Sequence, residues 1–468
     1  MTSKVTTGRP AARAVLIPLA LAQFICSFAG SNMNVMINDI SKDLNTTVQG
    51  VQAAITLFLL VMAALMIPGG KLTEKWGRKR CLNLGLAIYG VGALISAVAP
   101  GLPVLIIGNS ILEGVGTALL IPPVYILTTL LFTDLGSRAR AFGAINAAGG
   151  IGAATGPLIG GLITSAISWR AAFGFQVLVI IVIVVLSRKW VTDPLPADPS
   201  RPFDTMGAVL SAVGLVLAVM GITLADNNLW LCLGLVLSGI LVLAWFFHSM
   251  RVKERAGRPV LLSTSMFRNR ISNLGLITQN IQWLVLMGVS FSVSAYLQVV
   301  RGYSAIQTGV ILTAATVGLL LSSFAAERLA KRRQQRTLIA AGFALSVAGI
   351  LLFLLLLWLY GGPWPLVPGL FVIGLGIGTM LTPSVNIVQS AFPEDLQGEI
   401  SGLSRSVSNL GSSLGAAIAG TIVVAAIATP AGRPYAAALI VLAAFAVVGF
   451  VASLALPRRH GDVTTPAP

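Results

Sequence analysis

One acidic side chain, Glu113, falls well inside a long apolar stretch of the chain, residues 104–131. Counted from the expected outer end it lies about ten residues in, which corresponds to roughly 14 Å of helix. If this stretch crosses a membrane, an ionised carboxylate at that depth costs on the order of 2.5–3.5 kcal/mol, so the default interpretation of Glu113 is functional. Burial favours the protonated form, as a reversible proton carrier requires. The alternative is a permanently protonated Glu113 that hydrogen-bonds to Ser110 or to an asparagine of the first apolar stretch.

Arg405 is the only cation expected inside an apolar stretch, one or two turns into residues 400–427. It could bind an anionic group of a ligand, pair with an acid, or extend its stem toward the helix end near Glu399. Other polar and aromatic side chains would line a cavity between helices, although each one alone is better explained by helix–helix contact. These cavity candidates, with Arg405, are Asn32, Asn34, Ser110, Tyr125, Asn146, Gln279, Gln282, Trp283, Tyr296, Asn386 and Asn409.

Small residues dominate the stretch 143–161, which reads GAINAAGGIGAATGPLIGG. On a helix, four-residue spacing of glycines forms a groove in which another helix backbone can lie. Pro157 frees a backbone carbonyl and kinks the helix. A packing seam is one interpretation, and a hinge between two moving helix bundles is the other. The complete pattern favours the hinge, with the members Gly143, Gly152, Gly156, Pro157, Gly160 and Gly161.

A basic loop, residues 70–80, reads GKLTEKWGRKR. Gly70 and Gly77 allow a sharp reversal of the chain, and the basic residues hold the loop at a cytoplasmic membrane face. Glu74 is its only acid, and its carboxylate could contact a helix N-terminus or Arg78, for about 0.3–1 kcal/mol each when exposed. An ordinary basic loop would carry the Lys and Arg cluster alone. The order of glycines, acid and bases is too specific for such a loop.

The composition shows which elements must position these residues. Of the 468 residues, 56% are hydrophobic and 10% are charged, whereas soluble domains carry about 25% charged residues. Apolar runs long enough to cross a membrane recur along the chain, which predicts an all-α polytopic membrane protein. The basic N-terminus resembles a signal peptide, but its apolar segment is too long and lacks a small-residue cleavage site. We therefore count it as the first of fourteen spans.

The net charge of +16 follows membrane topology rather than nucleic-acid binding. Most Lys and Arg fall on alternate loops, which places those loops and both termini in the cytoplasm by the positive-inside rule. The three cysteines and two histidines show no disulfide framework or metal-ligand spacing. No metal site, enzyme activity or nucleic-acid partner is predicted.

The spans divide into three groups: an N-terminal six-helix bundle in 1–190, two additional helices in 191–271, and a C-terminal six-helix bundle in 272–468. The additional spans, 207–225 and 230–248, are apolar on nearly every face, which predicts contact with lipid. The loop 326–336, AERLAKRRQQR, weakly repeats the 70–80 loop. Such an echo is expected between parallel transporter halves.

The sequence resembles a known family, the major facilitator superfamily, and within it the fourteen-span drug:proton antiporter group. The 70–80 loop is similar to the superfamily's cytoplasmic-gate motif, with Glu74 in place of the usual aspartate. The 143–161 stretch resembles the motif typical of exporters. The resemblance implies two six-helix bundles plus two extra helices. It also extends to Trp169-Arg170, Phe203-Asp204-Thr205-Met206-Gly207, Tyr296-Leu297-Gln298 and Arg301-Gly302-Tyr303-Ser304.

Two departures from this pattern concern proton coupling. Ala29 stands where exporters of this group usually carry an aspartate in the first span, and the nearest acid is Asp39. In the fourth span, Ser110-Ile-Leu-Glu113-Gly114 replaces the usual Arg-x-x-Gln-Gly. These changes put the group's standard proton-coupling residues in question and make Glu113 the candidate.

The sequence thus predicts a secondary active exporter of hydrophobic or amphipathic small molecules, in exchange for protons, by alternating access. No nucleotide-binding loop is present, and the proton gradient replaces any cofactor. Sparse acids favour neutral, zwitterionic or anionic amphiphiles. The alternatives are a lipid or metabolite translocator with weak coupling, and a non-transporting membrane sensor. We expect a monomer in a bacterial cytoplasmic membrane, in contact with lipids and its substrate.

Overall fold

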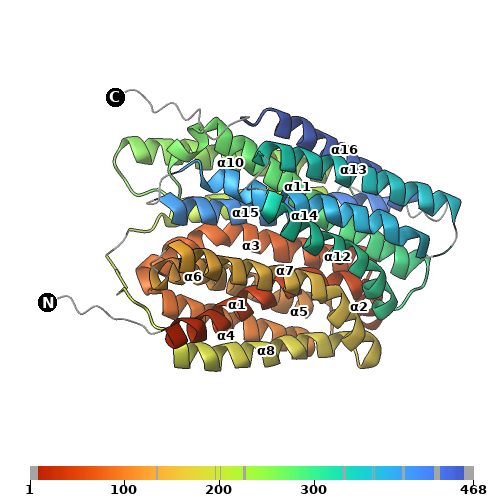
Figure 1. The fold of residues 1–468 in the computed structure, drawn as a ribbon, viewed down its shortest axis with the longest axis horizontal. Helices are drawn as coiled ribbons and strands as arrows, with labels where there is room; N and C mark the ends of the chain where they lie inside the picture. The colour runs from red at the N-terminus through yellow and green to blue at the C-terminus, as the bar shows by residue number, and fades with distance from the viewer. Residues whose placement is uncertain are drawn as a thin grey trace. The chain divides into compact units, whose positions relative to one another are not determined.

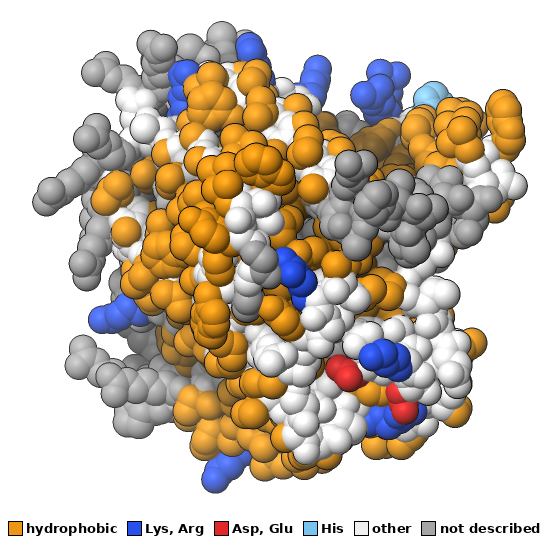
Figure 2. All heavy atoms as spheres, turned by 90° about the vertical axis from the view of Figure 1, so that its right-hand side faces the viewer, with side chains coloured by type: hydrophobic (Ala, Val, Ile, Leu, Met, Phe, Trp, Pro, Cys, Tyr) orange, Lys and Arg blue, Asp and Glu red, His pale blue; other side chains and the backbone are white. Residues whose placement is uncertain are grey.

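The computed structural model describes residues 9–132, 135–195, 197–200, 202–224, 228–329, 334–360, 362, 364–392, 396–425 and 433–457. Among these residues, fourteen helices are long and apolar enough to cross a membrane. The prediction of an all-α protein with fourteen spans is therefore confirmed. Figure 2 shows the side of the molecule that lies at the right in Figure 1, where the helices are seen from their ends; hydrophobic side chains cover much of this face and acidic ones are few.

Contacts divide the chain into two units. The first comprises Met1–Ala218, Leu237–Leu261 and Tyr303–Gly309, and the second comprises Val219–Val236, Leu262–Gly302 and Val310–Pro468. The division of the sequence at 191 and 272 stays a prediction. Figure 1 labels the helices of both units.

The first unit contains three close helix pairings: α1 with α7, α4 with α6, and α4 with α8. Glycines bring α4 against its neighbours, since a Cβ on Gly92 would lie 2.6 Å from the carbonyl oxygen of Gly108. Large aromatic side chains such as Phe28, Phe58 and Phe173 are fully buried between the helices. The elements are α1 (Arg9–Asn32), η1 (Met33–Val35), α2 (Ile37–Asp43), α3 (Val48–Trp76), α4 (Arg78–Ala97), α5 (Leu102–Leu105), the π-helix η2 (Ile106–Glu113), α6 (Gly114–Leu131), α7 (Leu135–Ala166) and α8 (Trp169–Trp190).

The second unit pairs α11 with α15 and α13 with α14. Gly411 and Gly415 of α15 lie directly on the main chain of α11, so these two helices approach closely. The elements are η3 (Thr264–Arg268), α11 (Arg270–Ala295), the π-helix η4 (Tyr296–Val300), α13 (Gln335–Leu359), η5 (Trp364–Leu366), α14 (Val367–Gln389), α15 (Gln397–Ala425) and α16 (Arg433–Leu454). Helix α12 (Ala305–Leu329) begins in the first unit and continues in the second.

The two additional helices are α9 (Thr205–Thr223) and α10 (Leu229–Arg255). Asp204 joins them: its Oδ1 accepts hydrogen bonds from Gly207 N (2.9 Å), at the start of α9, and from Lys253 Nζ (2.6 Å), near the end of α10. Only 17% of the α10 span is buried. The Leu, Ile and Trp side chains of α10 are exposed in this chain. They suit contact with lipid acyl chains.

Candidate functional site

Glu113 closes the π-helix η2, and its side chain is fully enclosed, with 0% exposure. Ser96 Oγ, in the last turn of α4, lies 3.5 Å from Glu113 Oε1. Asn109 of η2 and Tyr89 of α4 face the same carboxyl group. Ser110, which the sequence suggested as a hydrogen-bonding neighbour, instead donates to the carbonyl oxygen of Ala54 on α3, at 2.8 Å. The partners of Glu113 thus come from η2 itself and from α4.

The polar contacts continue from Glu113 across the bundle. Tyr89 Oη donates a hydrogen bond to Gln176 Oε1 of α8, and Cys26 of α1 lies near both Thr117 and Glu113. Every one of these neighbours is uncharged. In this conformation the carboxyl group cannot touch a ligand, because no part of it is exposed.

A second polar cluster of the first unit reaches its surface. Tyr125 Oη of α6 lies 3.2 Å from Gln23 Oε1 of α1 and 3.0 Å from Asn146 Oδ1 of α7. The ring of Tyr125 stacks on that of Phe142 with centroids 5.9 Å apart. Asn146 is exposed, whereas Gln23 is 6% exposed. The structure thus brings together two of the predicted cavity residues, Tyr125 and Asn146, and adds Gln23, which the sequence analysis missed.

The glycine groove of α7 faces α1. A Cβ on Gly152 would meet the carbonyl oxygen of Phe24, and one on Gly156 would meet Ser31. Gly160 lies against Asn32, a fully buried side chain, while Gly143 has no neighbour within 4 Å. Gly152, Gly156 and Gly160 therefore pack against α1 inside the first unit, and their role as a hinge stays a prediction. Of the other predicted cavity residues nearby, Asn34 is buried and donates from Nδ2 to Ser31 O at 3.4 Å.

Gly161 and Pro157 of the same helix face the start of α12. A Cβ on Gly161 would lie 2.5 Å from the carbonyl oxygen of Ala305, and one on Gly309 would meet the carbonyl oxygen of Pro157. Ile306 N donates to Ser165 Oγ at 3.0 Å. The two backbones therefore touch through reciprocal glycines, which leaves no room for side chains between them.

The 70–80 loop turns at Gly77, whose φ of +92° favours glycine. A carboxylate that the sequence analysis did not single out, that of Asp193, lies at the N-terminus of α4, and the role of Glu74 stays a prediction. Asp193 Oδ2 accepts from Arg78 N (2.6 Å) and Lys79 N (3.2 Å). Glu74 contributes its main-chain oxygen, which accepts from Asp198 N at 3.4 Å. The segment after α8 thus holds the 70–80 loop in place. Gly70 lies near Pro122, with 3.8 Å between its built Cβ and the proline Cβ.

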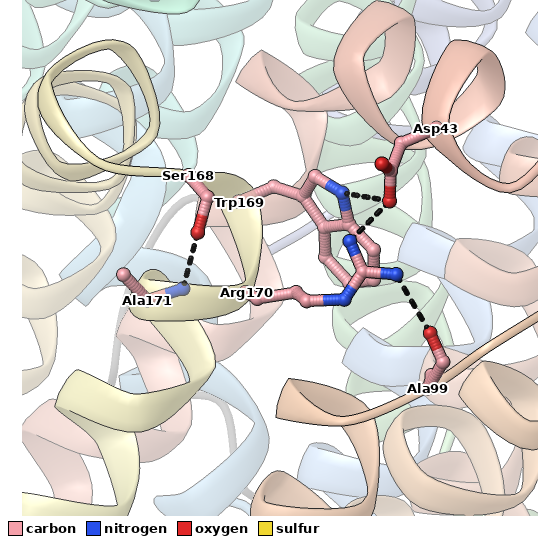
Figure 3. A network of polar contacts seen from close by, with 6 residues as sticks. All are labelled: Asp43, Ala99, Ser168, Trp169, Arg170 and Ala171. Carbon is pink, nitrogen blue, oxygen red and sulfur yellow. Dashed lines mark hydrogen bonds and ion pairs between the residues drawn. The ribbon is translucent and has the colours of Figure 1, made fainter.

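A network of polar contacts centres on Arg170, as Figure 3 shows. Its guanidinium pairs with Asp43 at the end of α2 and donates to Ala99 O at 2.9 Å, while Trp169 Nε1 donates to Asp43 Oδ2 at 3.1 Å. The Arg170 hydrogen bond holds the pKa of Asp43 below its usual value. Partial burial raises the pKa of Asp39, one turn earlier. Arg170 thus connects α2, the α4–α5 loop and α8.

In the second unit, two predicted cavity residues are engaged between helices. Gln279 of α11 donates to Ser408 Oγ and accepts from Ser404 Oγ of α15, both at 2.9 Å. Gln282 Oε1 accepts from Ser384 Oγ of α14 at 2.8 Å. Both glutamines are buried, so they hold the bundle together. Tyr296 is buried and its Oη accepts from Arg301 Nε at 2.7 Å; Trp283, Asn386, Arg405 and Asn409 are half-buried.

Comparisons with known proteins agree with this architecture. A family model described as Major Facilitator Superfamily matches residues 19–416. The puromycin resistance protein pur8 of Streptomyces alboniger is 28% identical over 87% of this chain and 81% of its own length. The multidrug efflux pump LfrA of Mycolicibacterium smegmatis is 26% identical over 89% and 82%. A crystal structure of the peptide transporter POT in complex with sulfate has a TM-score of 0.70 at 17% identity, over 97% and 95% of the two chains, and shows the shared fold.

Proposed function

Because the chain belongs to the major facilitator superfamily and is a transporter rather than an enzyme, we propose that it exports hydrophobic or amphipathic small molecules in exchange for protons. Relatives named for puromycin resistance and multidrug efflux support export. The observation that carries proton exchange is Glu113: a fully enclosed carboxyl group, in mid-span, surrounded by neutral partners. In this proposal Glu113 takes the role that the first-span aspartate holds in the resembling exporters.

The proposed cycle uses the contact between α7 and the first turn of α12 as the place where helices separate and close. Reciprocal glycines at Gly161 and Gly309 permit backbone contact without interlocking side chains, so little has to be rearranged when the contact opens. Protonation of Glu113 would favour one of the two conformations, a shift of a pre-existing equilibrium. The groove at Gly152, Gly156 and Gly160 keeps α1 and α7 together throughout.

The rest of the proposal follows from charge and apolarity. We place the protein in a bacterial cytoplasmic membrane with both termini cytoplasmic, because the basic loops alternate along the chain. It works as a monomer surrounded by lipid. It needs no cofactor besides the proton gradient.

Proteoliposomes test this function. We expect efflux of an amphipathic dye to accelerate when a pH gradient is imposed, and Glu113→Gln to abolish that acceleration while substrate counterflow without a gradient continues. Counterflow is the internal control, because it needs the moving helices but no proton. Gradient-independent flux in the wild-type protein would instead indicate the weakly coupled translocator. Absence of flux for all amphiphiles would indicate a sensor.

A further inference from the structure

The end of α10 carries a basic cluster that the transport cycle described above does not use. Four basic residues fall within residues 251–258, and Glu254 is the only acid among residues 245–258. Three of the four, Arg251, Arg255 and Arg258, are exposed. This end of the helix therefore presents an excess of positive charge on its surface.

The two sides of α10 differ at this end. Phe246 is buried, and Lys253, two turns further along the same side, donates from Nζ to Asp204 Oδ1 at 2.6 Å. Arg251 and Arg255 lie on the other side of the helix. Because they are four residues apart, one lies above the other with about 5–6 Å between their Cβ atoms, and like charges at this spacing repel each other. An anion that contacts both guanidinium groups would relieve this repulsion.

An exposed apolar stripe leads along α10 to these two arginines. Leu237, Leu241 and Trp245 are exposed and follow one another at four-residue spacing, which places them on one face of the helix. Exposed His248 continues that face. Arg255 follows Leu237 by 18 residues, which is about five full turns. The stripe and the arginines therefore share a face.

The length of α10 sets the depth of the arginines in a membrane. Arg251 follows Leu229, the first residue of the helix, by 22 residues. This separation corresponds to about 33 Å of helix, slightly more than the hydrocarbon thickness of roughly 30 Å. Arg251 and Arg255 therefore reach the level at which phospholipid headgroups begin.

We infer that this face of α10 binds an anionic phospholipid, with its acyl chains along the stripe of Leu237, Leu241 and Trp245 and its phosphate on Arg251 and Arg255. A guanidinium group can form two parallel hydrogen bonds with a phosphate. An anionic headgroup complements the two arginines, whereas the quaternary ammonium group of phosphatidylcholine is repelled by them. The inference concerns the lipid partner of α10 and goes beyond the proposed export function.

Site-directed fluorescence quenching tests this site in the full-length protein. Ala244→Cys, exposed on the same face, carries a bimane fluorophore in protein stripped of its three native cysteines. The protein is reconstituted in phosphatidylcholine vesicles that contain an equal small fraction of either phosphatidylglycerol or phosphatidylcholine with a doxyl quencher on one acyl chain. Each basic side chain at a membrane surface contributes about a fivefold preference for anionic lipid. We therefore expect phosphatidylglycerol to show an association constant at least fivefold higher, and equal constants for the two lipids would overturn the inference.

Paired substitutions test the two arginines. Arg251→Gln combined with Arg255→Gln should lower the preference for phosphatidylglycerol to less than twofold. The matched control combines Arg188→Gln with Lys189→Gln, which removes two exposed basic residues from the last turn of α8 and should leave the preference unchanged. An equal fall in both double variants would show that the overall charge of the protein, rather than this face, attracts the lipid, and the inference would be wrong.

Two further measurements complete the test. An excess of inorganic phosphate should leave the preference unchanged, since the acyl chains contribute to binding; displacement of the lipid by phosphate would indicate a site for a soluble anion and refute the inference. If the double variant does not yield folded protein, Arg255→Gln alone replaces it. That variant should lower the preference at least twofold, and an unchanged preference would refute the site.

Discussion

Adding one methyl group at Gly161 should shift the conformational equilibrium of the transporter. The Cβ of Gly161→Ala would lie 2.5 Å from Ala305 O and 2.9 Å from Ala305 C, both main-chain atoms that cannot rotate away. Relieving such a clash moves the first turn of α12 and costs typically about 1–3 kcal/mol. Because about 1.4 kcal/mol corresponds to a tenfold change in population, the state in which α7 and α12 touch should lose roughly fivefold to 150-fold in relative population.

Chemical labelling measures this shift. Thr308, beside the contact, is fully buried, so Thr308→Cys in a protein stripped of its three native cysteines reports separation of the two helices through reaction with a membrane-impermeant maleimide. We expect Gly161→Ala to accelerate labelling and to slow substrate turnover. Gly143→Ala is the matched control, since its Cβ would meet nothing within 4 Å.

Gly152→Ala distinguishes a shifted equilibrium from general damage. Its Cβ would meet the carbonyl oxygen of Phe24, on α1 within the same bundle. That clash should lower the thermal stability without changing the labelling rate of folded protein. If Gly161→Ala labelled and turned over substrate like Gly143→Ala, the assignment of the moving contact to α7 and α12 would be wrong.

Three further predictions concern charged groups outside the membrane spans. Asp193→Ala should destabilise the protein by about 0.5–2 kcal/mol, as loss of a helix cap does, whereas the exposed control Asp198→Ala should change the melting temperature little. Asp43→Asn should destabilise the protein by about 0.2–1 kcal/mol at pH 7. Because the pKa of Asp43 is lowered in the folded state, this difference in stability is present above pH 3.8 and disappears as the pH falls through the folded-state pKa. Asp39→Asn should have the opposite sign at pH 7, because the raised pKa of Asp39 makes its ionised form unfavourable in the folded state, and the gain should shrink as pH falls toward 3.8. Melting curves between pH 3 and 7 check both aspartates, and a destabilised Asp39→Asn at pH 7 would contradict the burial argument.

The number and type of the spans could be predicted because a single segment in lipid can hydrogen-bond all of its own backbone N–H and C=O groups only as a helix. Helix length and apolarity are local properties of the sequence. The glycine groove was predictable as a flat face for the same reason. The helix that packs in this groove was not predictable, because glycine spacing on one helix does not identify the neighbouring helix. The groove packs against α1, and only Gly161 and Pro157 contact α12.

Partners separated by a long stretch of chain lay beyond sequence reasoning. Asp193 reaches the N-terminus of α4 from 115 residues away along the chain, and the gate motif itself offered Glu74 for that role. Ser96 meets Glu113 because α4 and η2 cross at Gly92 and Gly108. Glycines in both stretches are the one signal that could have suggested this crossing.

The complete enclosure of Glu113 bears on energetic efficiency. A titratable group open to both aqueous compartments at once would let protons run down their gradient without any cargo moving. Closed off in the bundle interior by Ser96, Asn109 and Tyr89, this carboxyl group can exchange with water only while the surrounding helices part. In the proposed cycle its rate of exchange would be limited by the same motion that carries the cargo, and the membrane would stay tight to protons between turnovers.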